Sequence, residues 1–320
     1  MRRGAAVLAG GMLAALMGCA GSDVPLAPPT LIRIGVGSKG GDFDVMGRAL
    51  AKTLQEGQPG VVVEVVNNEG AVSSLESVEQ GRSDCGFSYA NLAYEGFVGK
   101  LSDEPGPFKQ LRGVALVEST PLHFIVRRRA GIRSVRDLIG RSVSLGPRGS
   151  GSYRAALPLM AAFGADSASV KIQNEPFNTS VKRMRAGELD AYFLLAGRPA
   201  NLIPNQINSN TELLPLEGAT IDALRERFPF LHAFVIPGGT YPGQAAPIRT
   251  VAVDSLLLCR NDFGAADVKR VTGDWFATLA ALTKYGKVTD ALNAGLASAT
   301  PIPLHAGASE YYRARQVLLH

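Results

Sequence analysis

Strand-like segments that end in glycine-rich loops and run directly into helix-like segments recur along this chain. The first such unit joins an alternating, β-branched segment at residues 31–36 to the loop Gly-Ser-Lys-Gly-Gly at 37–41. Apolar residues at helical spacing follow over 43–55. A later unit joins residues 142–145 to a loop at 146–152 and a helix that reaches residue 164. This alternation predicts an α/β fold with mostly parallel sheets, which bind ligands beyond the carboxyl ends of their strands.

The loop at residues 146–152 carries the groups best suited to holding an anion. A helix start offers free backbone N–H groups and partial positive charge, and here it is preceded by Arg148, Ser150, Gly151 and Ser152. The two hydroxyls can hydrogen-bond a carboxylate or phosphate, or they can simply cap the helix. Arg148 can pair with an anion or stand in solvent at the loop tip. The loop by itself is compatible with both interpretations.

The N-terminus has the pattern of a secretory signal. Arg2 and Arg3 precede an apolar run at residues 5–17 that is too short to span a bilayer. The run ends in Leu-Met-Gly-Cys, which resembles a bacterial lipobox and predicts cleavage of residues 1–18 and acylation of Cys19. Residues 19–30 then form a proline-containing tether to a membrane. An ordinary secretory signal with an incidental cysteine is the alternative, and inner or outer membrane remains open.

Composition excludes several classes of function. A hydrophobic content of 46% over 320 residues supports a large core, and this length favours two lobes. The formal net charge of +5 comes without the basic and aromatic interleaving of a nucleic-acid surface. The four histidines have no metal-ligand or triad spacing, so we expect no metal, no cofactor and no catalysis. Cys85 and Cys259 lie in apolar, strand-like contexts, where a disulfide and two free thiols are both possible.

Several blocks follow one another in a fixed order: GVGSKGG, LRGVALVESTPLHFIVR, VSLGPRGSGS, GELDAYFLLAGRP and IPGGTYPGQ. Together they resemble the TAXI family of solute receptors, which serve tripartite ATP-independent periplasmic (TRAP) transporters. The resemblance implies a two-lobed, type II-like periplasmic binding protein with mixed sheets and crossing hinge strands. One lobe comprises residues 31–122 and 236–320, and the other 123–235. Two strand-like segments, 111–117 and 122–127, mark the passage between them.

The resemblance also implies a function and a set of site residues. Such a receptor closes on a small organic anion, an amino acid or carboxylate, and delivers it to a membrane permease. The matching loops contribute the expected ligand-binding residues: Ser38, Lys39, Gly40, Gly41, Tyr89, Asn91, Arg148, Ser150, Gly151, Ser152 and Gly197.

Some of these positions depart from the family pattern. A glutamine and a carboxylate usual in the family's third loop are replaced by Tyr89 and Asn91. Tyr89 brings bulk and a stacking surface, which either shrinks the pocket or admits a less polar solute. Lys39 adds a cation to the first loop, whereas Asp42 and Asp44 would repel an anion unless they point away. The identity of the ligand therefore stays open.

Two other functional classes remain. The first is a lipid-anchored sensor or adaptor that works without a TRAP permease, and Ala20 favours it, because an aspartate at that position commonly retains lipoproteins in the inner membrane. The second is an enzyme on a binding-protein fold that uses Arg148 and Asp190, for which the sequence offers no motif.

Overall fold

The computed structural model describes residues 30–101, 106–200, 203 and 210–316. The predicted signal peptide, the acylated Cys19 and the tether as far as residue 29 lie outside these ranges. Within the described ranges, no helix combines the length and apolarity needed to cross a bilayer.

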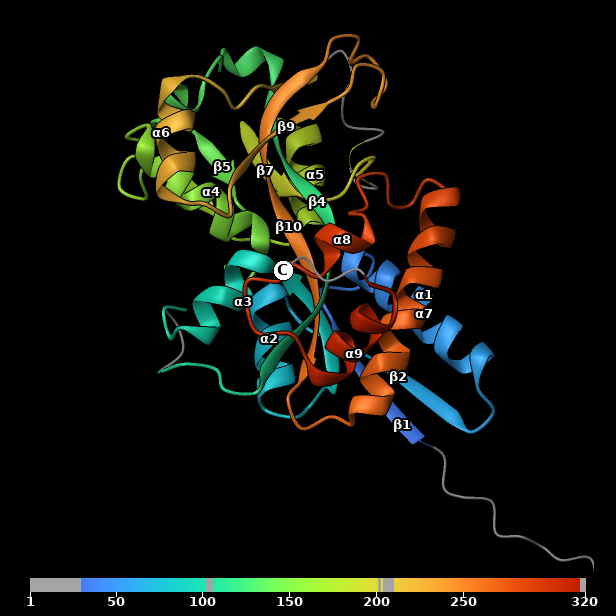
Figure 1. Cartoon of the computed structure of the whole chain (residues 1–320). Coiled ribbons are helices and arrows are strands. Elements are labelled where there is room, and N and C mark those ends of the chain that lie inside the picture. The colour runs from blue at the N-terminus through green and yellow to red at the C-terminus, as the bar shows by residue number, and fades with distance from the viewer. Residues whose placement is uncertain (1–29, 102–105, 201–202, 204–209, 317–320) are drawn as a thin grey trace, which may run out of the picture.

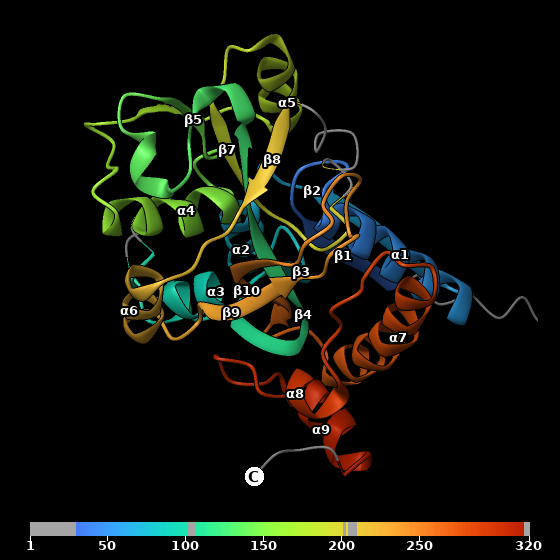
Figure 2. The ribbon, with the colours of Figure 1, turned by 90° about the horizontal axis from the view of Figure 1, so that it is seen from above.

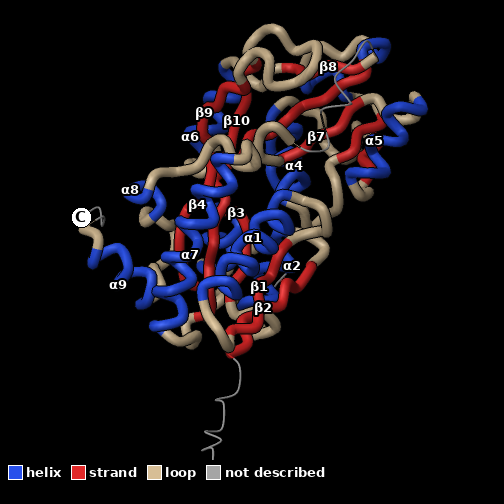
Figure 3. The backbone as a smooth tube through the Cα atoms, turned by 90° about the vertical axis from the view of Figure 1, so that its right-hand side faces the viewer, coloured by secondary structure: helices blue, strands red, loops and turns tan. Residues whose placement is uncertain are grey.

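The molecule has two lobes, which lie one above the other in Figure 1. Strands β1, β2 and β3 lie in the first lobe, with helices α1, α2, α3, α7, α8 and α9 around them (Figures 1 and 3). Their bounds are β1 Thr30–Val36, α1 Asp42–Gly57, β2 Val61–Asn67, α2 Ala71–Glu79, β3 Cys85–Tyr89, α3 Ala90–Phe97, α7 Ala265–Lys284, α8 Ala294–Ala297 and α9 Ala306–Ala314.

The second lobe holds strands β5 to β9 and helices α4, α5 and α6, as the view from above shows (Figure 2). Its elements are η1 Arg128–Ala130, η2 Val135–Leu138, β5 Ser142–Ser144, α4 Gly151–Ala162, β6 Lys171–Gln173, α5 Phe177–Ala186, β7 Ala191–Leu195, β8 Thr211–Leu214, α6 Ala219–Arg227 and β9 His232–Ile236. The predicted boundaries of the lobes at residues 122/123 and 235/236 stay a prediction.

Two long strands, β4 (Leu111–Arg127) and β10 (Ile248–Arg260), run through both lobes. The described strands follow the order β2-β1-β3-β10-β4-β7-β5-β6, with β8 beside β4 and β9 beside β10. The outer pairs of this order are parallel, whereas β10 and β4 pair antiparallel with each other and with their other neighbours. The predicted mixed α/β fold is therefore confirmed.

The expectation of two separate strands at 111–117 and 122–127 was wrong, because β4 is continuous. Two of the polar residues between them are satisfied across the ladder, where Ser119 donates to Asp254 at 2.8 Å. Thr120 shares a hydrogen bond of 2.7 Å with Ser255. Polar side chains that face each other on neighbouring strands remove the cost of placing them inside a sheet.

A disulfide between Cys85 and Cys259 joins β3 to β10. The two residues lie directly opposite each other in the antiparallel ladder. Of the two alternatives that the sequence left open, the structure therefore shows the disulfide. Beside it, the buried rings of Phe87 and Trp275 meet edge to face at 5.2 Å, in the core that packs α7 on the sheet.

Candidate functional site

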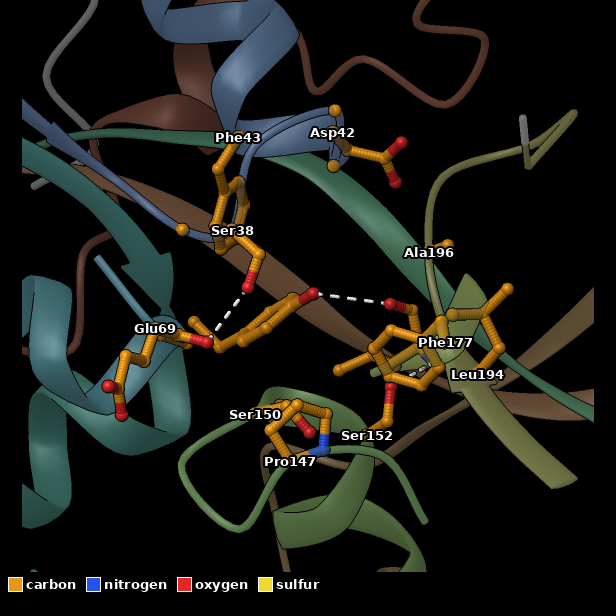
Figure 4. A pocket seen from close by; sticks show the side chains of 18 of the residues that line it. Ser38, Asp42, Phe43, Glu69, Pro147, Ser150, Ser152, Phe177, Leu194 and Ala196 are labelled. Atoms are coloured by element: carbon orange, nitrogen blue, oxygen red, sulfur yellow. Dashed lines mark hydrogen bonds between the residues drawn. The ribbon is translucent and has the colours of Figure 1, made fainter. Parts of the chain in front are cut away.

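A cavity of about 120 Å³ lies between the two lobes, beyond the carboxyl ends of β1, β3 and β7 (Figure 4). The first lobe lines it with the loop after β1 and with the starts of α1 and α2. The second lobe contributes the start of α4, Phe177 of α5 and the end of β7. The lining residues are Gly37, Ser38, Gly40, Gly41, Asp42, Phe43, Glu69, Gly70, Ala71, Tyr89, Pro147, Ser150, Gly151, Ser152, Phe177, Leu194, Leu195, Ala196 and Ala200.

The structure brings most of the sequence-predicted site residues together at this cavity. Those that line it are Ser38, Gly40, Gly41, Tyr89, Ser150, Gly151 and Ser152. Gly197 follows the lining residue Ala196 and donates its N–H to Asp42 at 2.7 Å. Seven predicted residues from loops far apart in the sequence thus border one space, and their role in binding a ligand stays a prediction.

Besides Gly197, three predicted residues do not line the cavity. Lys39 is exposed and borders a different surface depression. Asn91 hydrogen-bonds Glu95, four residues further along α3. Arg148 is exposed, with its guanidinium 5.9 Å from the centre of the Tyr153 ring. The structure therefore gives these three side chains positions away from the cavity.

The three serines present different hydrogen-bonding groups to the cavity. Ser150 caps α4, since its Oγ accepts the N–H of Tyr153 at 3.2 Å. Ser152 Oγ accepts the N–H of Leu195 at 2.8 Å. Both hydroxyls still have a hydrogen to donate, whereas Ser38 already donates its own to the carbonyl of Glu69 at 2.8 Å. The α4 side of the cavity is therefore the donor-rich side.

Aromatic rings form much of the remaining wall. The rings of Phe43 and Tyr89 meet at 4.9 Å between centroids, and Phe177 faces them from the second lobe (Figure 4). The Tyr89 hydroxyl donates to the carbonyl of Leu195 at 3.4 Å. Burial raises the pKa of Tyr89 well above its usual value, and the nearby charges of Asp42 and Glu118 raise it further. The hydroxyl therefore stays protonated and remains a donor.

Asp42 is the charged group that the structure adds to the site. Its carboxylate accepts the Gly197 N–H across the lobe boundary, and burial raises its pKa while that hydrogen bond opposes the rise. The sequence left open whether Asp42 and Asp44 point away from a ligand. Asp44 does, because it accepts from Gly40 N–H and Asn67 at 2.9 Å each, whereas Asp42 lines the cavity.

Backbone contacts also join the lobes around the cavity. The N–H of Val72, at the start of α2, donates to the carbonyl of Gly149 at 3.2 Å. Gly70 must lack a side chain here, because a Cβ would come within 2.7 Å of that same carbonyl oxygen. The starts of α2 and α4 therefore meet at one edge of the cavity, and direct contacts between the lobes border it.

Phe177 and residues 194–196 are lining residues that the sequence did not indicate. They are apolar, and their place at the site depends on how the second lobe packs against the first. Among the described residues, no group of three or more histidine, cysteine or acidic side chains is arranged to hold a metal ion.

Comparison with known proteins identifies a matching sequence family and structures with the same fold. Residues 34–314 match the model of the NMT1-like family. The structure of PhnD1 from Prochlorococcus marinus in complex with methylphosphonate has a TM-score of 0.55 at 12% sequence identity, covering 90% of this chain and 99% of that one. The likeness to PhnD1 shows a shared fold.

Two sulfonate-binding proteins are also similar. The alkanesulfonate-binding protein SsuA from Xanthomonas axonopodis pv. citri, bound to MOPS, has a TM-score of 0.48 at 16% identity and covers 92% of this chain and 96% of its own. The periplasmic aliphatic sulphonate binding protein SsuA from Escherichia coli has a TM-score of 0.49 at 15% identity, with 90% and 94% covered.

Proposed function

This chain belongs to the NMT1-like family, and from that premise we propose that it is an extracytoplasmic receptor that captures a small organic anion between its two lobes. The observation that carries the proposal is the cavity itself, which both lobes line and whose walls come from loops at strand ends. Ligands of open α/β sheets bind at this position.

The chemistry of the α4 side supports an acidic group on the ligand. The hydroxyls of Ser150 and Ser152 have hydrogens to donate there, at the start of a helix of 12 residues. Hydroxyl donors and a helix start together favour a carboxylate or a similar anion. The anion is then held without a lysine or arginine side chain, because no lysine or arginine is among the residues that line the cavity.

Lobe closure is the proposed mode of capture. The contacts of Asp42 with Gly197 and of Val72 with Gly149 form only when the lobes meet. A ligand that touches both walls binds this closed form better than an open one, so it shifts the population toward closure. The closed receptor then docks on a membrane permease.

The permease partner is proposed to be of the TRAP type, on the resemblance of the ordered sequence blocks to TAXI receptors. PhnD1, which shares the fold, is named for a complex with methylphosphonate, so a small anion in this fold has a precedent. Anchoring through Cys19 would tether the receptor to a membrane, and delivery to such a permease requires that this be the inner membrane.

The experiment that tests this function is mass spectrometry of small molecules released when the purified protein is denatured. We expect an amino acid or carboxylate in an amount comparable to the protein. Release of a sterol, a lipid or a cofactor would overturn the ligand class. Co-purification from solubilised membranes with a sensor kinase, in place of a permease, would favour the sensor alternative.

A further inference from the structure

Carboxylates outnumber cations around Gly197, at the end of the cavity opposite the donor-rich start of α4. Asp42 accepts the Gly197 N–H at 2.7 Å. Glu118 of β4 lies against the same residue, because a Cβ on Gly197 would come within 2.9 Å of its Oε1. Asp290 is the third acid, and it pairs at 2.5 Å with Arg198.

Glu118 is buried without a hydrogen-bond partner for its Oε2. The residue is 1% exposed, and the nearby charges that act on it are those of Asp42, Asp290 and Arg198. A buried carboxylate is costly unless a cation or several donors compensate it. Arg198, the one guanidinium in this group, pairs through Nη2 with Asp290, so three acids share a single cation. The described residues therefore leave Asp42 and Glu118 short of positive charge.

The pKa values of both acids are raised, as expected for carboxyl groups that lack a compensating cation. Burial raises the pKa of Asp42, and it raises the pKa of Glu118 well above the usual range, with the charges of Asp42 and Asp290 adding to the effect on Glu118. A cation beside them would reverse both changes, because an opposite charge favours the ionised form. A ligand is one source of such a cation, and Asp42 is the member of the pair that lines the cavity.

Asp42 has the capacity to bind such a group. It uses one hydrogen bond from Gly197, whereas an ionised carboxylate accepts about four. Figure 4 shows its side chain beside Ala196, on the side of the cavity away from Ser150 and Pro147. The cavity thus has hydroxyl donors at one end and a carboxylate acceptor at the other.

We propose that the solute is a small zwitterion whose ammonium group binds the carboxylate of Asp42 while its acidic group meets Ser150 and Ser152. This inference rests on the proposed receptor function and narrows it from organic anions in general to molecules with an amino group. Asp42 is then the residue that discriminates between an amino acid and the same acid without its amino group. The aromatic rings of Phe43, Tyr89 and Phe177 surround an apolar side chain of the solute.

The test measures affinity by calorimetry for matched pairs of probes. The amino acids are alanine, valine, leucine and phenylalanine, and the partners are propanoate, 3-methylbutanoate, 4-methylpentanoate and 3-phenylpropanoate. We expect the wild-type protein to bind at least one amino acid about tenfold or more tighter than its partner acid. In Asp42→Asn, which keeps the size of the side chain, this ratio falls close to one.

The control variant is Glu69→Gln. Glu69 also borders the cavity, but its carboxylate turns away from it (Figure 4). The variant removes the same charge and should keep the tenfold preference. Circular dichroism and thermal unfolding of each variant establish that it is folded.

The outcomes separate this inference from the receptor function. If the acids bind as tightly as the amino acids, or if Asp42→Asn keeps the wild-type ratio, the ammonium site is wrong and the anion receptor stands. If no probe binds and the denatured protein releases no small acid, both proposals are wrong. A tenfold preference that Asp42→Asn abolishes and Glu69→Gln retains supports both.

Discussion

The α-carbon of Gly151 packs directly against the ring of Tyr89. The two residues come from opposite lobes, and a Cβ at position 151 would overlap carbons of the ring. The contact therefore requires glycine at the first position of α4. The backbone conformation of Gly151 would by itself admit other residues. It sets how closely the two lobes approach on that side of the cavity.

The variant Gly151→Ala should weaken ligand binding about tenfold, because the added methyl group pushes against the Tyr89 ring when the lobes close. Overpacking of this kind typically costs about 1–3 kcal/mol. Calorimetry with the ligand identified by mass spectrometry measures the loss. The same substitution made in a Tyr89→Ala background should cost clearly less, and equal losses in both backgrounds would show that the ring is not the cause.

Replacing Ser152 by alanine should weaken ligand binding and leave the buried N–H of Leu195 without its acceptor. Replacing Ser150 by alanine should weaken ligand binding and remove the cap of α4. Ser150 caps α4, and loss of a serine cap costs about 1 kcal/mol. Thermal unfolding without ligand measures these structural losses, and the further rise in unfolding temperature on adding ligand measures binding. If the double variant, Ser150→Ala with Ser152→Ala, is stabilised by ligand as much as the wild type, this loop is not part of the site.

Acidification should destabilise the protein through His123. This buried side chain shares a 2.7 Å hydrogen bond with the Tyr241 hydroxyl, and burial lowers its pKa from 6.5 to about 4. The unfolded chain then binds more protons, so stability present above pH 6.5 is lost as the pH falls toward 4.

Comparison with His123→Gln isolates this effect, because His305, whose pKa burial also lowers, is common to both proteins. Between pH 7 and pH 5, the free energy of unfolding, measured with urea, should fall by about 2 kcal/mol more in the wild type than in the variant. If the difference in the free energy of unfolding between the two proteins does not change with pH, His123 is not the source of the acid sensitivity.

Breaking the disulfide should destabilise the fold by about 3–5 kcal/mol, because the bond joins residues that lie 174 positions apart in the chain. Urea unfolding with and without a reductant measures the change. The paired variant Cys85→Ser with Cys259→Ser should match the reduced wild type and should not respond to reductant. Wild-type protein that unfolds at the same urea concentration after its thiols are shown to be free would contradict this expectation.

The anchor can be tested by replacing Cys19 with serine in the full-length chain. Without a thiol to acylate, the receptor should move from the membrane fraction to the soluble extracytoplasmic fraction. Metabolic labelling with a fatty acid gives the matching readout. Label retained by Cys19→Ser would contradict acylation at this cysteine.

The sequence indicated the backbone of the site better than its side chains. The loops at 37–41 and 146–152 were recognised because glycine and serine mark helix starts directly. Asn91 was expected in the site because it matches a position in the third loop of the TAXI family. It lies in the first turn of α3, where its side chain meets the residue four positions further on. Lys39 and Arg148 are charged side chains on exposed loops, where solvation competes with any ligand.

The residues that the sequence missed depend on contacts between the lobes. Phe177 and Leu194 are ordinary core-type residues in their own elements, and nothing in their local pattern distinguishes them from buried neighbours. The role of Asp42 depends on Gly197, which lies 155 positions away. The disulfide could not be decided from the sequence for a related reason. Cys85 and Cys259 face each other because β3 pairs with β10, and hydrophobic periodicity does not specify which strands pair.

The order in which the chain is synthesised has a consequence for how it folds. The sheet of the first lobe is complete only when β10 joins β3, and β10 ends at residue 260. Chains truncated between α6 and β10 therefore contain all the strands of β1 to β3 with an unpaired edge and an unpartnered Cys85. We therefore expect such a truncated chain not to fold independently, although it contains every residue that lines the cavity.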